Sequence, residues 1–170
     1  MPWQTYTLRA IRAARLAGKR AARAGARTVE PEHWLDALLA DRAAIPFVLN
    51  ELNIDIAALK SEARKLAGAG GRAPRSKPRF SKRTTLILEA AAKEAHSLGE
   101  REIDARHLLL GVSREGGAAA RLLEQHHATP AALRQAIRKA LHIAAPARCP
   151  ECGYDLRATP LRCPECGKDV

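Results

Sequence analysis

The 170-residue sequence is poor in aromatic residues, which make up 4% of it, and it has no long apolar run. Val, Ile, Thr and Tyr are too sparse for a protein built on β-sheets, whereas the abundant alanine favours closely packed helices. No segment approaches the ~20 apolar residues of a membrane span, and the first residues lack the apolar core of a signal peptide. These absences predict a cytoplasmic, all-α protein with no membrane partner. The length of the chain predicts one domain of ordinary size and a small appendage.

The motifs of common enzyme classes are also missing. The sequence contains no H-E-x-x-H zinc-protease motif, no nucleophile elbow and no G-x-x-x-x-G-K-[S/T] phosphate loop. Its acidic residues show no pairing that suggests general acid–base catalysis. We therefore predict that the chain is not an enzyme.

An internal repeat organises most of the chain. A shift of 74 residues aligns 6–67 with 80–141 without a gap, and 15 of these 62 positions are identical. The two copies are joined by 68–79, a segment of Gly, Pro and charged residues that is typical of a linker. We predict one domain over 1–144 and a separate tail over 145–170.

Helix-capping signals recur at matching places in the two copies. A hydroxyl or acidic residue precedes each main helix, and a glycine follows the first helix of each copy at Gly25 or Gly99. The paired caps are Thr7/Ser81 for the first helix, Glu30/Asp104 for the second and Asp55/Thr129 for the fourth. A shorter third helix is expected within 43–52 and 118–126. Each copy is thus predicted to hold four short helices, and the two copies to pack with pseudo-twofold symmetry.

The two copies resemble the Clp repeat N-terminal domain at the front of Clp-type AAA+ unfoldases. The resemblance is carried by YTLRAIRAARLAGKRAARAG and VEPEHWLDALL in the first copy, and by IDARHLLLGVSREGGAAARLLEQ in the second. It implies a non-catalytic receptor for substrates and adaptors, which in that family feeds an ATPase ring. The ring is absent here, so the expected partners are a Clp AAA+ unfoldase or client proteins.

All four cysteines lie in the tail, in the pattern C-x2-C-x10-C-x2-C. Two such pairs can supply the four thiolates of a tetrahedral zinc site, with a glycine after each second cysteine to let the chain turn. The expected ligands of one structural Zn²⁺ in a zinc ribbon are Cys149, Cys152, Cys163 and Cys166. A rubredoxin-type iron site and a redox dithiol remain as alternatives.

The basic residues are concentrated in the predicted helical domain. The tail holds four basic and four acidic residues, so the whole formal charge of +11 belongs to 1–144. The first helix has no acidic residue between positions 7 and 27, and its cations cover one continuous arc opposite a row of alanines. This predicted basic face comprises Arg9, Arg12, Arg15, Lys19, Arg20, Arg23 and Arg27. It suits an acidic protein surface or phosphates, although a merely solvated face is the alternative.

The second helix of each copy begins with opposite charges, Glu32 in the first copy and Arg106 in the second. In some Clp N-terminal domains, the glutamate at this place and the hydroxyl residue that begins the first helix bind phosphoarginine on clients. The resemblance therefore implies a site at Thr7 and Glu32. Its counterpart at Ser81 and Arg106 would reject a guanidinium or accept an anion. The alternative is that the hydroxyl residues only cap helices and Glu32 only complements the helix dipole.

Two recurring histidines, His33 and His107, are expected to satisfy backbone groups, and Trp34 is expected in the core. The favoured function is an adaptor, client receptor or regulator for a Clp unfoldase–protease. The alternative is a nucleic-acid-binding protein that uses its zinc ribbon and the basic face of the first helix.

Overall fold

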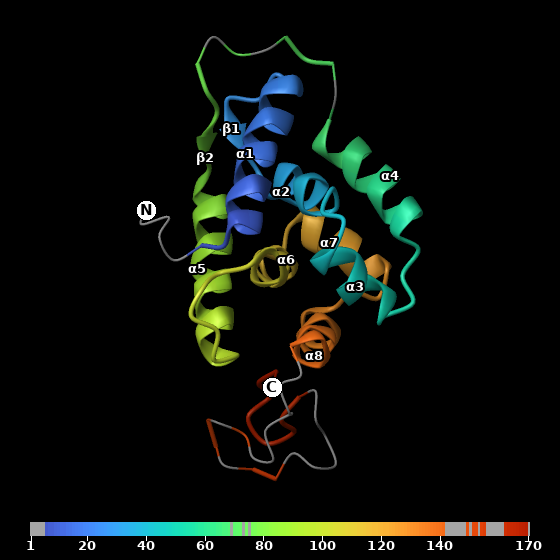
Figure 1. The fold of residues 1–170 in the computed structure, drawn as a ribbon, viewed down its shortest axis with the longest axis vertical. Coiled ribbons are helices and arrows are strands. Elements are labelled where there is room, and N and C mark those ends of the chain that lie inside the picture. The colour runs from blue at the N-terminus through green and yellow to red at the C-terminus, as the bar shows by residue number, and fades with distance from the viewer. Residues whose placement is uncertain are drawn as a thin grey trace.

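The structure is a computed structural model that describes residues 6–68, 70–72, 74, 76–141, 149, 151–152, 154–155 and 162–169. In this part of the chain it contains eight helices and one pair of short strands (Figure 1). The first copy holds α1 (Leu8–Arg23), β1 (Thr28–Val29), α2 (Pro31–Leu38), α3 (Ala44–Asn50) and α4 (Ile56–Ala67). The second holds β2 (Arg79–Phe80), α5 (Lys82–Ser97), α6 (Ala105–Arg114), α7 (Ala118–Gln125) and α8 (Pro130–Ala140). The predicted all-α fold with four helices in each copy is confirmed.

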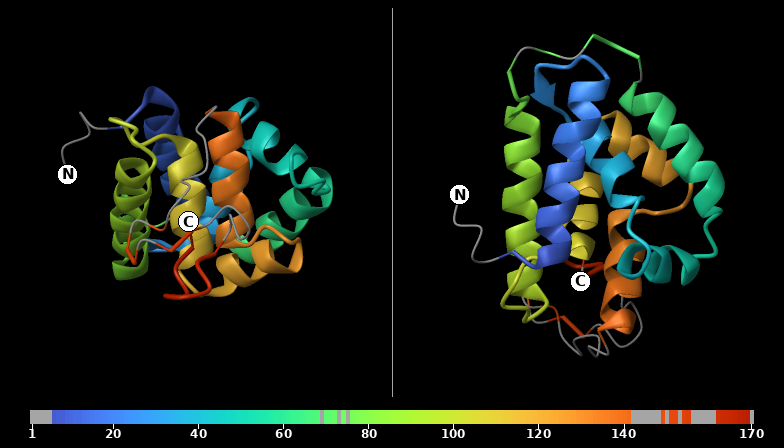
Figure 2. Two further views of the ribbon diagram at one scale, coloured as in Figure 1. Left: turned by 90° about the horizontal axis from the view of Figure 1, so that it is seen from below. Right: turned by 45° about the horizontal axis from the view of Figure 1, so that its top comes forward.

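Helices α2 and α6 form the centre of the molecule. Both are buried along nearly their whole length, and Figure 2 shows α6 between α5 and α8. Contacts between the copies occur in symmetric pairs, since α3 packs on α6 and α8 while α7 packs on α2 and α4. The two copies therefore share one apolar interior.

The helices begin and end at the predicted signals. Thr7 and Ser81 accept hydrogen bonds from the backbone N–H groups of Ala10 and Thr84, at 3.2 and 3.1 Å. Gly25 and Gly99 both adopt a φ of 74°, a left-handed conformation in which a side chain would be strained. Local sequence thus determines where the long helices stop.

A short parallel strand pair, absent from the sequence-based expectations, links the two copies. Thr28 and Val29 of β1 pair with Arg79 and Phe80 of β2. The symmetric counterpart is a single bridge between Tyr6 and Ile103. In each case the segment entering the first helix of one copy lies beside the segment entering the second helix of the other.

Alanine side chains allow these helices to approach closely. The buried face of α1 consists of Ala10, Ala13, Ala14, Ala17 and Ala21, and α1 packs with this face against α2. Trp34 is fully buried, as expected for a core residue. In the described residues, no helix has the length and apolarity needed to cross a membrane.

Candidate functional site

An arginine at the start of the first helix of each copy links the two copies. The Arg9 guanidinium lies 3.5 Å from the Asp41 carboxylate of its own copy and 3.7 Å from that of Asp104 in the other. Arg83, the symmetric residue, contacts Glu115 of its own copy and lies 4.0 Å from Glu30 of the other. These two matching networks hold the helix starts of the two copies together.

The structure pairs the predicted hydroxyl and charged residues across the copies. The Thr7 hydroxyl donates a 3.0 Å hydrogen bond to Asp104, and Asp104 also accepts a 3.1 Å hydrogen bond from Arg106. Thr7 therefore lies beside α6, whose first turn carries Arg106, and not beside Glu32, with which the family resemblance grouped it. The helix that carries Glu32 instead lies beside the start of α5, whose N-cap is Ser81.

The acid at the start of α2 has an internal partner. The Glu32 carboxylate lies 3.5 Å from the Arg83 guanidinium, and its side chain is 13% exposed. A ligand guanidinium would therefore have to compete with Arg83 for the Glu32 carboxylate. The phosphoarginine site stays a prediction.

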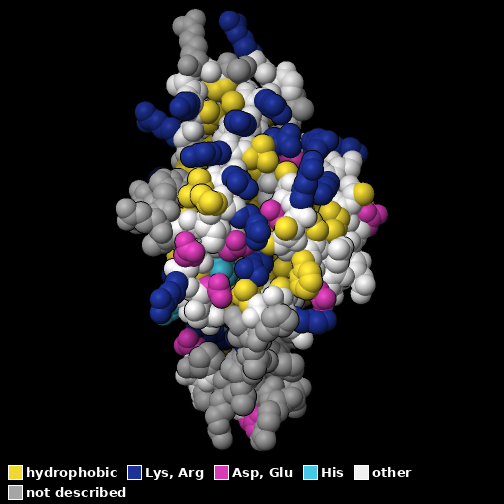
Figure 3. Space-filling view, viewed as in Figure 1, with side chains coloured by type: hydrophobic (Ala, Val, Ile, Leu, Met, Phe, Trp, Pro, Cys, Tyr) yellow, Lys and Arg dark blue, Asp and Glu magenta, His cyan; other side chains and the backbone are white. Residues whose placement is uncertain are grey.

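The basic face of α1 is narrower than the sequence pattern indicates. Arg20 lies 2.9 Å from Asp36 and Arg9 belongs to the network above, so these two cations are neutralised within the fold. The remaining cations are exposed and have no carboxylate partner in the described residues: Arg12, Arg15, Lys19, Arg23 and Arg27. Figure 3 shows many Lys and Arg side chains over the upper half of this side of the molecule. We call these five residues the free basic row.

The recurring histidines hold helix starts, as expected. The backbone N–H of Glu30 donates to His33 Nδ1 at 2.9 Å, and that of Asp104 donates to His107 Nδ1 at 3.0 Å. Burial lowers the pKa of His33, and burial lowers the pKa of His107 to about 4. Neutral imidazole is the form that can accept these hydrogen bonds.

Acidification is expected to destabilise the protein through His107. Because its pKa falls from 6.5 in the unfolded chain to about 4 in the folded one, the unfolded state binds the proton first. The free energy of unfolding therefore decreases as the pH falls from 6.5 to about 4. His107 accounts for about 3 kcal/mol of this decrease. Urea unfolding at about pH 7 and about pH 4.5 should show a smaller loss for His107→Gln, which keeps an acceptor at this capping position. His96→Gln, at an exposed position on α5, is the control; equal losses in all three proteins would contradict the prediction.

The four tail cysteines form a compact cluster. Their Sγ atoms all lie within 4.8 Å of one another, with Cys149 and Cys166 at 3.6 Å and Cys152 and Cys163 at 3.4 Å. A ZnS₄ tetrahedron with Zn–S bonds of about 2.3 Å has edges of about 3.8 Å, whereas a disulfide needs about 2.05 Å. The cluster therefore fits a tetrahedral metal ion.

The two cysteine knuckles share one backbone geometry. The Cys149 N–H donates to the Tyr154 carbonyl at 2.7 Å, and the Cys163 N–H donates to the Lys168 carbonyl at 2.8 Å. A hydrogen bond from the Cys152 backbone contributes most to lowering the pKa of the Cys149 thiol to about 7, whereas the pKa values of the Cys152 and Cys166 thiols are raised in the same cluster. The glycine of the first knuckle and residues 156–161 of the spacer lie outside the described residues.

The chain just after the second knuckle is docked on the second copy by a network around two buried charges. Glu94, which is 5% exposed, contacts Arg114 at 2.8 Å and Arg134 at 3.0 Å. Arg134 also donates a 2.9 Å hydrogen bond to the Asp169 carbonyl, and Arg114 lies 3.6 Å from the Asp169 carboxylate. We call Glu94, Arg114, Arg134 and Asp169 the Glu94 network. This network joins α5, α6 and α8 to the tail.

The Glu94 network was not predicted, although the positions of Glu94 and Arg134 in the sequence indicate that both are buried. Glu94 is spaced with the inward-facing Ile87 and Ala91 of α5, and Arg134 lies beside Leu133 and Ile137 on α8. Two opposite charges at inward-facing positions of one copy indicate a buried pair.

Comparison with known proteins identifies the family of this duplicated four-helix domain. The model of the family described as "Clp repeat (R) N-terminal domain" matches residues 5–126 and 79–160, so the chain belongs to this family. It is 35% identical over 139 residues to the chaperone protein ClpC1, chloroplastic, of Arabidopsis thaliana, covering 80% of this chain and 15% of that protein. It is 30% identical over 138 residues to the chloroplastic chaperone protein ClpC3 of Oryza sativa subsp. japonica, covering 81% and 15%. The chain thus spans a small part of the length of these relatives.

Solved structures share the fold. The N-terminal domain of the chaperone ClpD from Arabidopsis thaliana matches with a TM-score of 0.65 at 25% identity, over 84% of this chain and 97% of that one. The N-domain of ClpV from Vibrio cholerae matches with a TM-score of 0.68 at 17% identity, over 84% and 88%. A ClpV N-domain in complex with a VipB peptide matches with a TM-score of 0.62 at 18% identity, over 84% and 90%.

Proposed function

We propose that this chain is a non-catalytic protein-binding module that serves a Clp unfoldase–protease as an adaptor, client receptor or regulator. A related fold has been captured with a bound peptide, in the ClpV N-domain complex. Reversible docking of a partner on α1 would require no chemistry from the chain itself.

The free basic row is the observation that carries this proposal. In the described residues its five cations have no internal carboxylate partner, unlike Arg9 and Arg20 on the same helix. A helix that is only solvated usually mixes charges of both signs. Unpaired positive charges favour an acidic partner surface and increase its rate of association.

We further propose that Cys149, Cys152, Cys163 and Cys166 hold one structural Zn²⁺. The ion would supply the folding energy that a tail of this size cannot obtain from an apolar core. With four thiolates the loaded tail would carry a net negative charge, so it would add little to the binding of nucleic acid.

Nucleic-acid binding is the second candidate, favoured by the formal charge of +11. It has little support from the aromatic side chains that stack on bases. Trp34 is buried and Tyr6 is 9% exposed. The exposed aromatic side chains among the described residues, Phe47 and Tyr154, lie on α3 and in the tail rather than on α1.

Affinity purification of the full chain from nuclease-treated cells, in about 0.3 M salt, tests the proposal. We expect a Clp ATPase or its clients to co-purify, and the yield to fall at least about fivefold for Arg12→Ala/Arg15→Ala/Lys19→Ala. The matched control, Lys60→Ala/Arg64→Ala/Lys65→Ala on α4, removes the same charge elsewhere and should leave the yield unchanged. Recovery of nucleic acid alone, without Clp components or clients, would contradict the proposal.

A further inference from the structure

A small cavity lies beside α1, where this helix meets the C-terminal end of α2. Its volume is about 370 Å³, within the range of small-ligand sites. The buried part of its lining is apolar and consists of Ala13, Ala37, Leu38 and Ala105, with the partly buried Leu16 beside them. These side chains offer contact to an aliphatic group.

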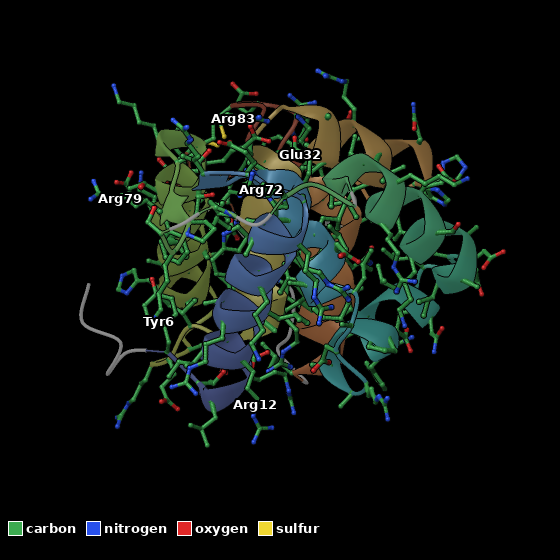
Figure 4. All side chains as sticks on the ribbon, turned by 90° about the horizontal axis from the view of Figure 1, so that it is seen from above. Tyr6, Arg12, Glu32, Arg72, Arg79 and Arg83 are labelled. Atoms are coloured by element: carbon green, nitrogen blue, oxygen red, sulfur yellow. The ribbon has the colours of Figure 1, made fainter. Side chains whose placement is uncertain are left out.

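Three arginines and one aspartate supply the charged groups of the cavity: Arg9, Arg12, Arg42 and Asp41. The Asp41 carboxylate is already in use, because it accepts 3.1 Å hydrogen bonds from the backbone N–H groups of Ala43 and Ile45 and lies 3.5 Å from Arg9. It therefore leaves Arg12 and Arg42 without a carboxylate partner in the described residues. Both are exposed, and Figure 4 shows Arg12 on the outer side of α1.

We propose that this cavity binds a peptide segment of a partner protein in which a carboxylate side chain neighbours a small aliphatic one. The aliphatic group would enter the apolar floor while the carboxylate pairs with Arg12 and Arg42. The inference rests on the proposed protein-binding function and names the site and the ligand chemistry for it.

The composition of the cavity favours a peptide over a nucleic acid. No aromatic side chain lines it, so it offers no stacking platform for a base. The alanine and leucine side chains of the floor match aliphatic groups, which a phosphate backbone lacks. A guanidinium binds a carboxylate with two charge-assisted hydrogen bonds, and two unpaired guanidinium groups at one rim therefore select for acidic residues.

Fluorescence anisotropy on the full chain tests the site, with a labelled synthetic peptide of alternating Glu and Val as the probe. We expect saturable binding that weakens at least about tenfold in Arg12→Ala/Arg42→Ala, which corresponds to about 1.4 kcal/mol. The control Arg64→Ala/Lys65→Ala on α4 removes the same charge outside the cavity and outside the free basic row, and should change the affinity less than about twofold. All four substituted residues are exposed, so circular dichroism should show an unchanged fold.

A second variant tests the apolar floor without altering charge. Ala40 lines the cavity and is exposed, so Ala40→Phe should fill the cavity, leave the core intact and weaken binding of the probe. A peptide with Gly in place of Val should also bind more weakly. Equal loss of affinity in the two double variants, equal affinity for the Gly-containing peptide, or no saturable binding would overturn the inference.

Different results would contradict the assignment of the cavity and the proposed Clp-linked function. If a Clp component co-purifies with the unaltered chain and equally with Arg12→Ala/Arg42→Ala, the cavity assignment is wrong while the protein-binding function stands. If the probe binds as described and no Clp component or client co-purifies, the site is correct and the Clp-linked role is wrong.

Discussion

Glu94→Ala is expected to lower the free energy of unfolding by about 3–5 kcal/mol, because it leaves the buried Arg134 guanidinium without a carboxylate partner. Arg134 is 8% exposed, and Glu94 supplies its carboxylate contact. Arg114 also contacts Glu94, but it keeps the Asp169 carboxylate at 3.6 Å when Glu94 is removed. Removing the acid therefore costs the desolvation of Arg134 without the compensating ion pair. Urea-induced unfolding, followed by circular dichroism, measures the change.

Two comparisons make this prediction specific. Glu89→Ala, at an exposed position of the same helix, should change the free energy of unfolding by less than about 0.5 kcal/mol. The double variant Glu94→Leu/Arg134→Leu should recover part of the lost stability, because apolar side chains can replace a buried ion pair. A similar small effect of Glu94→Ala and Glu89→Ala would show that the buried pair contributes nothing.

Removal of the proposed Zn²⁺ is expected to unfold the tail and leave the helices of both copies folded. Structural zinc contributes on the order of 10–16 kcal/mol to the folding of small domains, whereas the tail has only Cys149 and Cys163 as buried apolar residues among those described. A chelator should therefore make the tail susceptible to proteolysis while the helical circular dichroism signal changes little. Metal analysis should give one zinc ion per chain for the unaltered protein and close to none for Cys163→Ser.

The alternatives for the tail give different results. A rubredoxin-type iron site would produce a coloured protein that contains iron. A redox dithiol would contain no metal and would form a disulfide on oxidation. Either result would contradict the zinc assignment.

The sequence predicted the fold because most of its signals are local. Thr7 and Ser81 cap the first helices, and Gly25 and Gly99 end them, through contacts within a few residues. The 74-residue repeat then predicts that both copies fold alike. Such features depend on neighbouring residues and on helical periodicity, both of which a single sequence displays.

The remaining features depend on which segments meet in space. The β1–β2 pair, the cross-copy contact of Thr7 with Asp104, and the docking of Asp169 on Arg134 join residues far apart in the chain. The helical arc of α1 correctly placed its alanines inside. The same arc could not show that Arg20 pairs with Asp36 on another helix.

Photo-crosslinking in the cell tests the central claim, that the exposed side of α1 contacts protein. A photoreactive amino acid would replace Arg15 on α1 or, as a matched control, Glu89 at the symmetric position of α5; both positions are exposed. We expect crosslinks from position 15 to a Clp unfoldase or its clients, and few from position 89. Crosslinks from position 15 to nucleic acid, or the same protein products from both positions, would contradict the account.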